Sequence, residues 1–133
     1  MLTGELPVSI GNLTNLVLLK LQNNRLTGKV PSSFGNLKNL TELDLSRNAF
    51  SGELSTWIGD LTRLNSLEIS YNCFQSVIPS GLINLKSLIG HLNVSHNKLT
   101  GKIPLHRFPY PASSFVGNPG LCDYPLPPCH ATA

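Results

Sequence analysis

The 133-residue sequence predicts one domain, folded as a short α/β solenoid of stacked repeats. Three observations predict this fold class. Asparagines recur at intervals of 24, 24 and 25 residues, each of them closes an apolar run of constant spacing, and each is followed by a similar short block. The recurring asparagines are Asn24, Asn48, Asn72 and Asn97. A fixed period of this length is typical of architectures in which every unit buries its apolar face against its neighbours.

The apolar runs predict the first short strand of each repeat. Leucines three residues apart are compatible with a helix, but the apolar pair two residues apart before each asparagine breaks the helical period. That pair predicts a strand with both apolar side chains on one face. The runs are Leu13, Leu16, Leu19, Leu21; Leu37, Leu40, Leu43, Leu45; Leu61, Leu64, Leu67, Ile69; and Leu85, Leu88, Leu92, Val94.

The blocks after the asparagines predict a second short strand with a turn beside it. Glycine suits that turn because it lacks a Cβ, and we assign Gly28, Gly52 and Gly101 to it. The recurring asparagines are expected to be structural, because a buried amide can bind loop backbone groups where the chain leaves the strand. The blocks are residues 2–7, 26–31, 50–54, 74–79 and 99–104.

Together with the segment Ser33-Phe34-Gly35-Asn36-Leu37, these blocks resemble the plant extracellular subclass of leucine-rich repeats, which occurs in receptor-like kinases, receptor-like proteins and polygalacturonase inhibitors. The resemblance covers residues 2–104. It implies a right-handed arc with a parallel concave β-sheet, a convex side made mostly of loop and 3-10 turns, and an irregular carboxy-terminal cap. The sequence departs from the family pattern at Ser55 (for Pro), at Gln75-Ser76 (for Thr-Gly), and by one extra residue between Leu88 and Leu92.

We divide the chain into two parts: residues 1–104 hold about four full repeats after an incomplete first one, and residues 105–133 form a proline-rich cap with the start of a linker. The cap prolines preclude a regular helix or a central strand. The resemblance implies that Cys122 and Cys129 form a disulfide, hence an oxidising compartment. From its position directly after Asn72, we interpret Cys73 as an unpaired structural thiol. The apolar residues expected to cover the last repeat are Phe108, Phe115 and Leu121.

The residues between the inward leucines are expected to point outward on the concave face. Neighbouring strands lie about 4.8 Å apart, which predicts one ladder of equivalent residues. An acidic patch on such a ladder has two interpretations, a solvated surface or a site for a peptide or a partner ectodomain. The family favours the second, with Tyr71 as an aromatic anchor. The predicted ladder is Lys20, Asp44, Glu68 and Asn93, and the candidate ligand-binding residues are Lys20, Gln22, Glu42, Asp44, Arg47, Glu68, Tyr71, His91 and His96.

The resemblance implies a peptide- or protein-binding module of a plant cell-surface receptor that perceives a ligand in development or defence, with a co-receptor ectodomain as a further partner. We expect the parent protein at the extracellular face of the plasma membrane or in the cell wall, and we interpret the chain as the carboxy-terminal part of an ectodomain or as a truncated gene product. Two alternatives stay open: a secreted inhibitor of microbial cell-wall-degrading enzymes, and a truncated product without its own ligand.

Other classes find little support in the composition. Ten Lys and Arg against seven Asp and Glu give a net charge of +3, without the basic run or stripe that nucleic acid or an anionic membrane would require. The sequence contains no apolar stretch of about 18 residues, so it predicts no membrane helix. His91 and His96 lie near serines of the predicted face, but no nucleophile elbow, phosphate loop or metal-binding pattern accompanies them. We expect no catalytic residues, no cofactor and no metal in this chain, although the parent can carry a kinase domain elsewhere.

Three Asn-x-Ser/Thr sequons, at Asn12, Asn39 and Asn93, are candidate glycosylation sites and suit a secreted protein. A glycan on Asn93 would shield the last strand of the predicted face.

Overall fold

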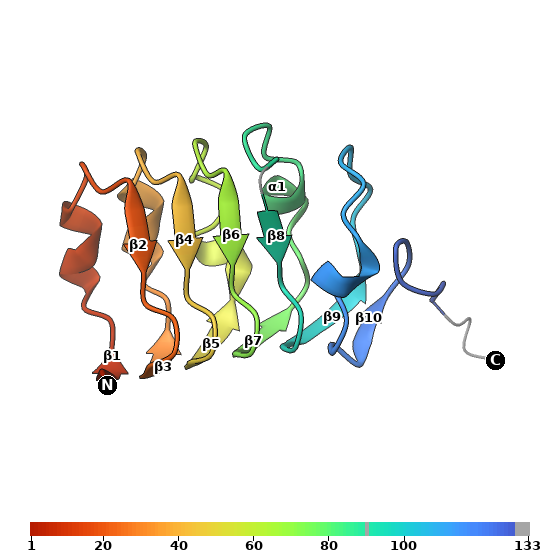
Figure 1. Ribbon diagram of the computed structural model, residues 1–133, viewed down its shortest axis with the longest axis horizontal. Helices are drawn as coiled ribbons and strands as arrows, with labels where there is room; N and C mark the ends of the chain where they lie inside the picture. Colours follow the sequence, from red (N-terminus) through yellow and green to blue (C-terminus); the bar gives the residue numbers. More distant parts are fainter. Residues whose placement is uncertain (90, 130–133) are drawn as a thin grey trace.

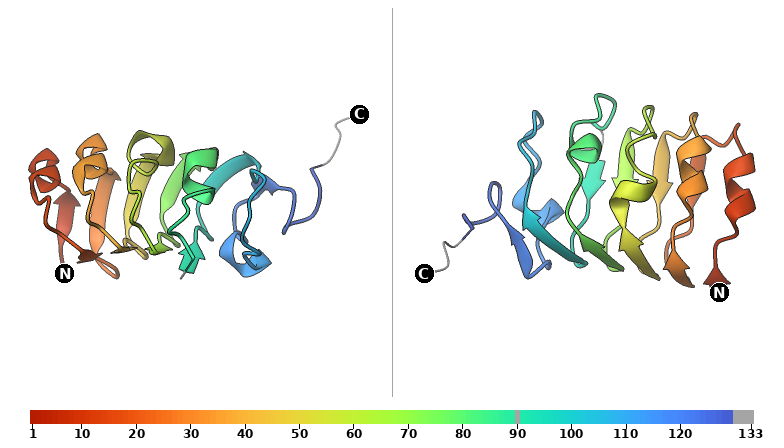
Figure 2. Two further views of the ribbon diagram at one scale, coloured as in Figure 1. Left: turned by 90° about the horizontal axis from the view of Figure 1, so that it is seen from above. Right: turned by 180° about the vertical axis from the view of Figure 1, so that it is seen from behind.

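The computed structural model describes residues 1–89 and 91–129, which form a row of stacked coils from one end of the chain to the other (Figure 1). The strands collect into one sheet of four and one sheet of six, and all pairs are parallel. Figure 2 shows the helical turns aligned along the row. No helix in the described ranges is long and apolar enough to cross a bilayer. The predicted repeat solenoid is therefore confirmed.

The four-stranded sheet consists of the strands that precede the recurring asparagines. Strands β2 (Leu18–Lys20), β4 (Glu42–Asp44), β6 (Ser66–Glu68) and β8 (His91–Asn93) lie side by side in that order (Figure 1). Their central leucines pair in register across the sheet, and all but the first are buried. Because side chains alternate along a strand, the flanking residues point outward. The predicted strand pattern is thus confirmed; the outer surface of this sheet is called the four-stranded face below.

The six-stranded sheet is built from the second blocks and one strand of the cap. It runs through β1 (Thr3–Glu5), β3 (Arg25–Lys29), β5 (Ala49–Glu53), β7 (Cys73–Ser76), β9 (Lys98–Lys102) and β10 (Gly120–Cys122).

The repeat glycines lie inside these strands, so their predicted place in a turn beside the strand is wrong. Gly52 has a φ of +89°, and a Cβ there would lie 2.9 Å from Lys29 Cγ of the preceding repeat. Glycine adopts this backbone conformation without strain. In the repeat that departs from the pattern, Ser76 takes the glycine position with a φ of +68°.

Short helical turns connect the two sheets. They are η1 (Val8–Asn12), η2 (Ser32–Asn36), η3 (Leu54–Thr56) and α1 (Ser80–Ile83). A proline with φ between −60° and −74° precedes each turn except η3, because proline presets the extended entry. Where Ser55 replaces that proline, the turn starts two residues earlier in the repeat and is three residues long. The predicted 3-10 and loop character of this side is confirmed, apart from the single turn of α-helix.

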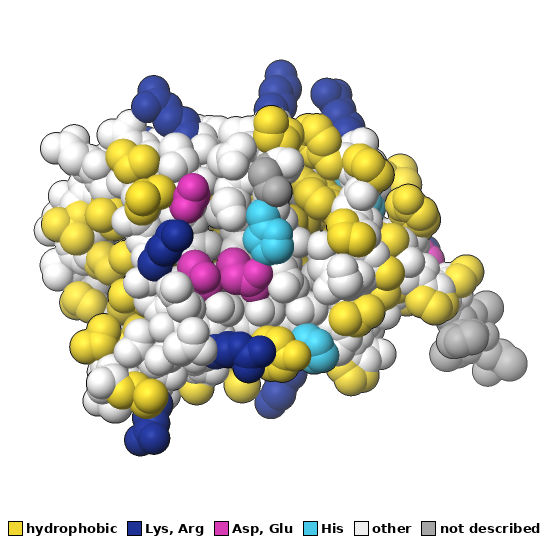
Figure 3. Space-filling view, viewed as in Figure 1, with side chains coloured by type: hydrophobic (Ala, Val, Ile, Leu, Met, Phe, Trp, Pro, Cys, Tyr) yellow, Lys and Arg dark blue, Asp and Glu magenta, His cyan; other side chains and the backbone are white. Residues whose placement is uncertain are grey.

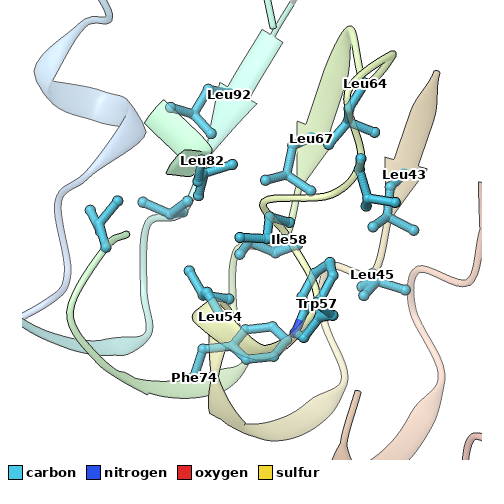
Figure 4. Packing of buried hydrophobic residues seen from close by; sticks show 14 of the residues in the cluster. Leu43, Leu45, Leu54, Trp57, Ile58, Leu64, Leu67, Phe74, Leu82 and Leu92 are labelled. Atoms are coloured by element: carbon cyan, nitrogen blue, oxygen red, sulfur yellow. The ribbon is translucent and has the colours of Figure 1, made fainter. Parts of the chain in front are cut away.

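The core runs along the solenoid between the sheets and the helical turns (Figure 4). Leucines from successive repeats stack on one another, and Trp57 packs against Phe34 and Phe74 with ring centroids 5.7 and 6.2 Å apart. Burial is complete in the middle of the row and weakens at its start, where Leu2 is 55% exposed and Leu6 and Ile10 are half-buried. Association through this apolar end stays a prediction.

The recurring asparagines have the structural role that the sequence predicts. Asn72 illustrates the pattern: its Nδ2 donates to the Leu45, Ile69 and Ser70 carbonyls, and its Oδ1 accepts the Phe50 N–H at 3.0 Å. The same bonds recur at Asn48 and Asn97. These amides satisfy backbone groups of two adjacent repeats and so join the repeats.

The cap continues the asparagine ladder, which the sequence analysis missed. Asn118 is buried, accepts the N–H groups of Asn97 and Leu99, and donates to the Phe115 carbonyl at 2.8 Å. It is followed by β10, so the cap prolines exclude a central strand but permit this edge strand.

The disulfide between Cys122 and Cys129 is present, and Cys73 is a free, half-buried thiol. Phe115 and Leu121 are buried against the last repeat, as expected, and Phe108 is half-buried.

Candidate functional site

The four-stranded face carries the predicted ladder. The pairings join Lys20 to Asp44, Asp44 to Glu68, and Glu68 to Asn93. In Figure 3 the acidic side chains form a group in the middle of this face, with basic side chains beside it and a histidine at its edge. The structure thus confirms the predicted ladder; the acidic patch below means Glu42, Asp44 and Glu68.

The carboxylates of the patch are fixed by local bonds. Asp44 Oδ1 accepts the N–H and the hydroxyl of Ser46, at 3.0 and 2.7 Å. Glu68 Oε1 accepts the same two groups from Ser70. Each serine stands two residues after its acid, at equivalent positions of two successive repeats. Local hydrogen bonds therefore hold both carboxylates in place, and no basic residue of the same strand is needed for this. Asp44 Oδ2 and Glu68 Oε2 remain for other partners; the second of them contacts His91.

Two charged contacts border the patch. Lys20 Nζ lies 3.6 Å from Glu42 Oε2, and both side chains are about half exposed. His91 Nε2 lies 2.8 Å from Glu68 Oε2. These residues surround a shallow hollow of about 210 Å³, lined by Lys20, Glu42, Leu43, Asp44, Ser66, Glu68 and His91. Three carboxylates and one lysine around one hollow favour a ligand with a basic group.

A second row follows the strands, one residue before each recurring asparagine. Its members Asn23, Arg47, Tyr71 and His96 all have φ between +56° and +59°. The Arg47 guanidinium lies 4.2 Å from the centre of the Tyr71 ring, and the His96 ring stacks on Tyr71 at 4.3 Å and 11°. Both faces of the Tyr71 ring are therefore covered.

This stacking changes the role expected of Tyr71. Although it is 43% exposed, it offers a ligand its ring edge and hydroxyl rather than an open aromatic face. Gln22, the remaining candidate, is half-buried, and its Oε1 has no hydrogen-bond partner among the described residues.

His91 and His96 each contact a different neighbour on the four-stranded face. His91 faces a carboxylate and His96 stacks on an aromatic ring, and neither has a hydrogen bond to a serine hydroxyl in the described ranges. The sulfur atoms of Cys122 and Cys129 lie close to the Asp123 carboxylate, but they are joined to each other in the disulfide.

Burial raises the pKa of Tyr110, whose hydroxyl donates to the Leu88 carbonyl at 2.7 Å.

The three sequons differ in accessibility. Asn12 is exposed at the end of η1. The Asn39 amide is engaged on both sides, because Nδ2 donates to the Thr14 carbonyl and Oδ1 accepts from Arg63 at 2.8 Å. Asn93 lies half-buried on the four-stranded face, beside a pocket between β8 and the cap.

Comparison with known proteins identifies the same leucine-rich repeats. Leucine rich repeat family models match residues 7–50, 63–85 and 89–106. A probable leucine-rich repeat receptor-like protein kinase of Arabidopsis thaliana is 55% identical over 49 residues, which are 37% of this chain and 4% of that protein. The chain therefore spans a small part of the curated relatives that it matches.

Two solved structures extend the likeness over nearly the whole chain. The ectodomain of the Arabidopsis thaliana receptor kinase GASSHO1/SCHENGEN3, in complex with CASPARIAN STRIP INTEGRITY FACTOR 2, superposes with a TM-score of 0.91 at 44% identity, covering 96% of this chain and 15% of that one. A chain of the BIR3–SERK2 complex, also from Arabidopsis thaliana, gives 0.89 at 38% identity, covering 97% and 69%. The chain belongs to the leucine-rich repeat family, in the subclass that forms plant receptor ectodomains.

Proposed function

We propose that the four-stranded face is an extracellular binding surface for an extended peptide or a partner ectodomain, and that a basic group of the ligand enters the acidic patch. The observation that supports this most directly is the ladder of Asp44 and Glu68, whose carboxylates are held by serines and line a hollow on the outer surface of the sheet. The GASSHO1/SCHENGEN3 ectodomain in complex with CASPARIAN STRIP INTEGRITY FACTOR 2 and the BIR3–SERK2 complex support a binding role for this subclass.

The acidic patch is suited to select and orient a ligand. Exposed carboxylates attract a basic ligand over distances comparable to the Debye length, about 8 Å at physiological ionic strength. Arg47 and the edge of Tyr71 border the other side of the patch, so a ligand must place its basic group between them and Lys20. A role in signalling during development or defence belongs to the parent receptor and is part of the same proposal.

A selection from random peptides displayed on phage tests the proposal. The bait is the secreted, disulfide-bonded chain, and its matched variant carries Glu42→Gln and Asp44→Asn, which remove two charges at constant shape. We expect enriched peptides to contain Lys or Arg, to bind the variant about tenfold more weakly, and to lose affinity with salt. Equal affinity for the chain and the variant would contradict the proposal.

A further inference from the structure

The loops that precede the strands of the four-stranded sheet form one rim of the solenoid. Side-chain bonds join neighbouring loops along this rim, as where Ser87 Oγ donates to the Thr62 carbonyl at 2.9 Å. The Asn84 amide continues the row into the cap, because its Nδ2 donates to the Leu105 carbonyl at 3.3 Å. The loops of successive repeats and the first segment of the cap therefore lie side by side.

This rim is basic. Its loops, residues 13–17, 37–41, 61–65, 85–89 and 105–111, contain four Lys or Arg and no Asp or Glu. The net charge of the whole chain is +3, so the acids and bases outside the rim nearly balance. Figure 3 shows basic side chains projecting from the rim, at the top of the view. The basic rim consists of Lys38, Arg63, Lys86 and Arg107.

The four cations differ in their contacts. Two are bonded within the rim, since Lys38 Nζ donates to a backbone carbonyl at 3.4 Å and Arg63 donates to Asn39 Oδ1 at 2.8 Å. Lys86 and Arg107 instead flank a hollow between the last repeat and the cap, and its lining contains no carboxylate. The ion pairs within the described residues lie elsewhere, on the four-stranded face. The charge of this pair is therefore available to a ligand.

The hollow between the two cations has an apolar floor. Its volume is about 210 Å³, and it is lined by Ile83, Asn84, Lys86, Arg107 and Phe108. Ile83 is buried and Phe108 is half-buried, so an apolar group placed there gains contacts and loses water. Asn84 joins the two walls, because its Nδ2 donates to the Ser80 carbonyl of α1 at 3.1 Å and also to the Leu105 carbonyl of the cap. Bonds within the chain therefore hold the hollow open between fixed walls.

We propose that this hollow, the rim pocket, binds a segment of a partner protein in which a Glu or Asp lies next to a Leu or an aromatic residue. The carboxylate lies between Lys86 and Arg107, and the apolar side chain packs on Phe108. A guanidinium binds a carboxylate through two parallel N–H bonds, which suits Arg107 to this role. The small volume favours a side chain of a protein over a free small molecule, since pockets for small ligands measure about 300–1,000 Å³.

The rim pocket and the acidic patch select segments of opposite charge. Three carboxylates surround the hollow of the acidic patch, so an acidic segment is repelled there, and the basic rim repels a basic segment for the same reason. Lys38 and Arg63 extend the positive field along the rim and attract the acidic segment. The chain can therefore hold a basic ligand on the four-stranded face and an acidic segment at the rim together, and the second site does not rest on the first.

The test selects random peptides displayed on phage against the full secreted chain, after removal of those that also bind the Lys86→Glu, Arg107→Glu variant. Each enriched peptide is synthesised with capped ends, and its affinity is measured for the chain, for that variant and for Lys98→Glu, Lys102→Glu. This matched control makes the same change of charge at exposed lysines of β9, on the other sheet. Melting curves check that both variants fold.

We expect the enriched peptides to share an Asp or Glu beside a Leu or an aromatic residue. They should bind the Lys86→Glu, Arg107→Glu variant at least about tenfold more weakly, and the control no more than about twofold more weakly. Replacing the acid of the peptide by its amide, or its apolar residue by serine, should each weaken binding about tenfold. These peptide changes test the site without altering the fold of the chain.

The absence of any enriched peptide would overturn the proposal, as would equal losses for the variant and its control. Binding that survives replacement of the apolar residue by serine, or that hexaglutamate reproduces, would show a surface for any polyanion and would overturn it too. Peptides for the rim pocket should keep their affinity for the Glu42→Gln, Asp44→Asn variant, whereas peptides for the acidic patch should lose it. Failure here is therefore distinct from failure of the acidic patch.

Discussion

The junction between β6 and β8 and the junction between β8 and the cap follow the same register but use different bonds. At the first, Leu67 pairs with Leu92 in a parallel strand; at the second, Ala112–Ser114 form the 3-10 turn η4 instead of a strand, and the Val94 N–H donates to the Ser114 carbonyl at 2.9 Å. Other contacts are conserved across both junctions, since Asn118 repeats the bonds of Asn97 and Phe115 fills the position of the inward apolar residue. Stacking of repeats and pairing of strands are therefore separable, and the asparagine ladder continues where the sheet stops.

The largest expected effect is that of the asparagine ladder, and it should be similar in the repeats and in the cap. Asn72→Ala and Asn118→Ala each leave several buried backbone groups without partners, so each should lower the free energy of unfolding by about 3 kcal/mol. Asn36→Ala, at an exposed asparagine, is the matched control and should change little. Urea unfolding gives the values; a negligible loss for Asn118→Ala alone would show that the cap is not held as a repeat.

Next in size is the disulfide, whose effect should be confined to the cap. Its sequence separation of seven residues corresponds to about 2.5 kcal/mol in the loop-entropy estimate. Changing Cys122 and Cys129 together to serine should expose β10 to proteolysis and leave β4 and β6 protected. Limited proteolysis with mass spectrometry measures this, and equal cleavage in the repeats would mean that the cap supports the whole solenoid.

A smaller effect, of opposite sign, is expected at the irregular repeat. Ser76 adopts a φ of +68°, where a non-glycine residue costs about 1 kcal/mol, so Ser76→Gly should stabilise the chain by roughly that amount. Gly52→Ala should destabilise it, because the φ is +89° and the new Cβ would approach Lys29. Thermal unfolding of both variants measures these changes in stability. A loss of stability in Ser76→Gly would contradict the backbone argument.

The smallest effect on folding is expected at the acidic patch. Lys20 and Glu42 are about half exposed, and such pairs contribute about 0–1 kcal/mol, so Lys20→Ala should leave the unfolding midpoint nearly unchanged. A large loss of stability would assign these residues to the fold rather than to ligand binding.

Much of the fold could be predicted because the period is written in side chains that must be buried or bonded. The four recurring asparagines and the leucine runs predicted the strands of the four-stranded face, and strand alternation then predicted its ladder. Asn118 was missed because only Phe115, rather than a leucine run, precedes it, although an apolar residue three positions before an asparagine is the same signal.

Features that depend on contacts between repeats could not be predicted. The covering of Tyr71 by Arg47 and His96 requires the spacing and φ values of three repeats. The glycines were assigned to turns because the sequence does not show that the backbone turns left-handed within a strand. The pocket between β8 and the cap lies where Ala112–Ser114 form a 3-10 turn instead of a strand, which no residue pattern reveals.

Amide hydrogen exchange of Leu67 and Leu92, followed residue by residue by NMR on the unliganded chain, examines the contrast between the two junctions. Both residues are almost completely buried, but only Leu67 donates its N–H to a neighbouring strand. We predict exchange at Leu92 that is faster than at Leu67 by about a hundredfold or more. Equal protection of the two amides would show that the cap pairs with Leu92 as a further strand would, and the distinction between the two junctions would have to be abandoned.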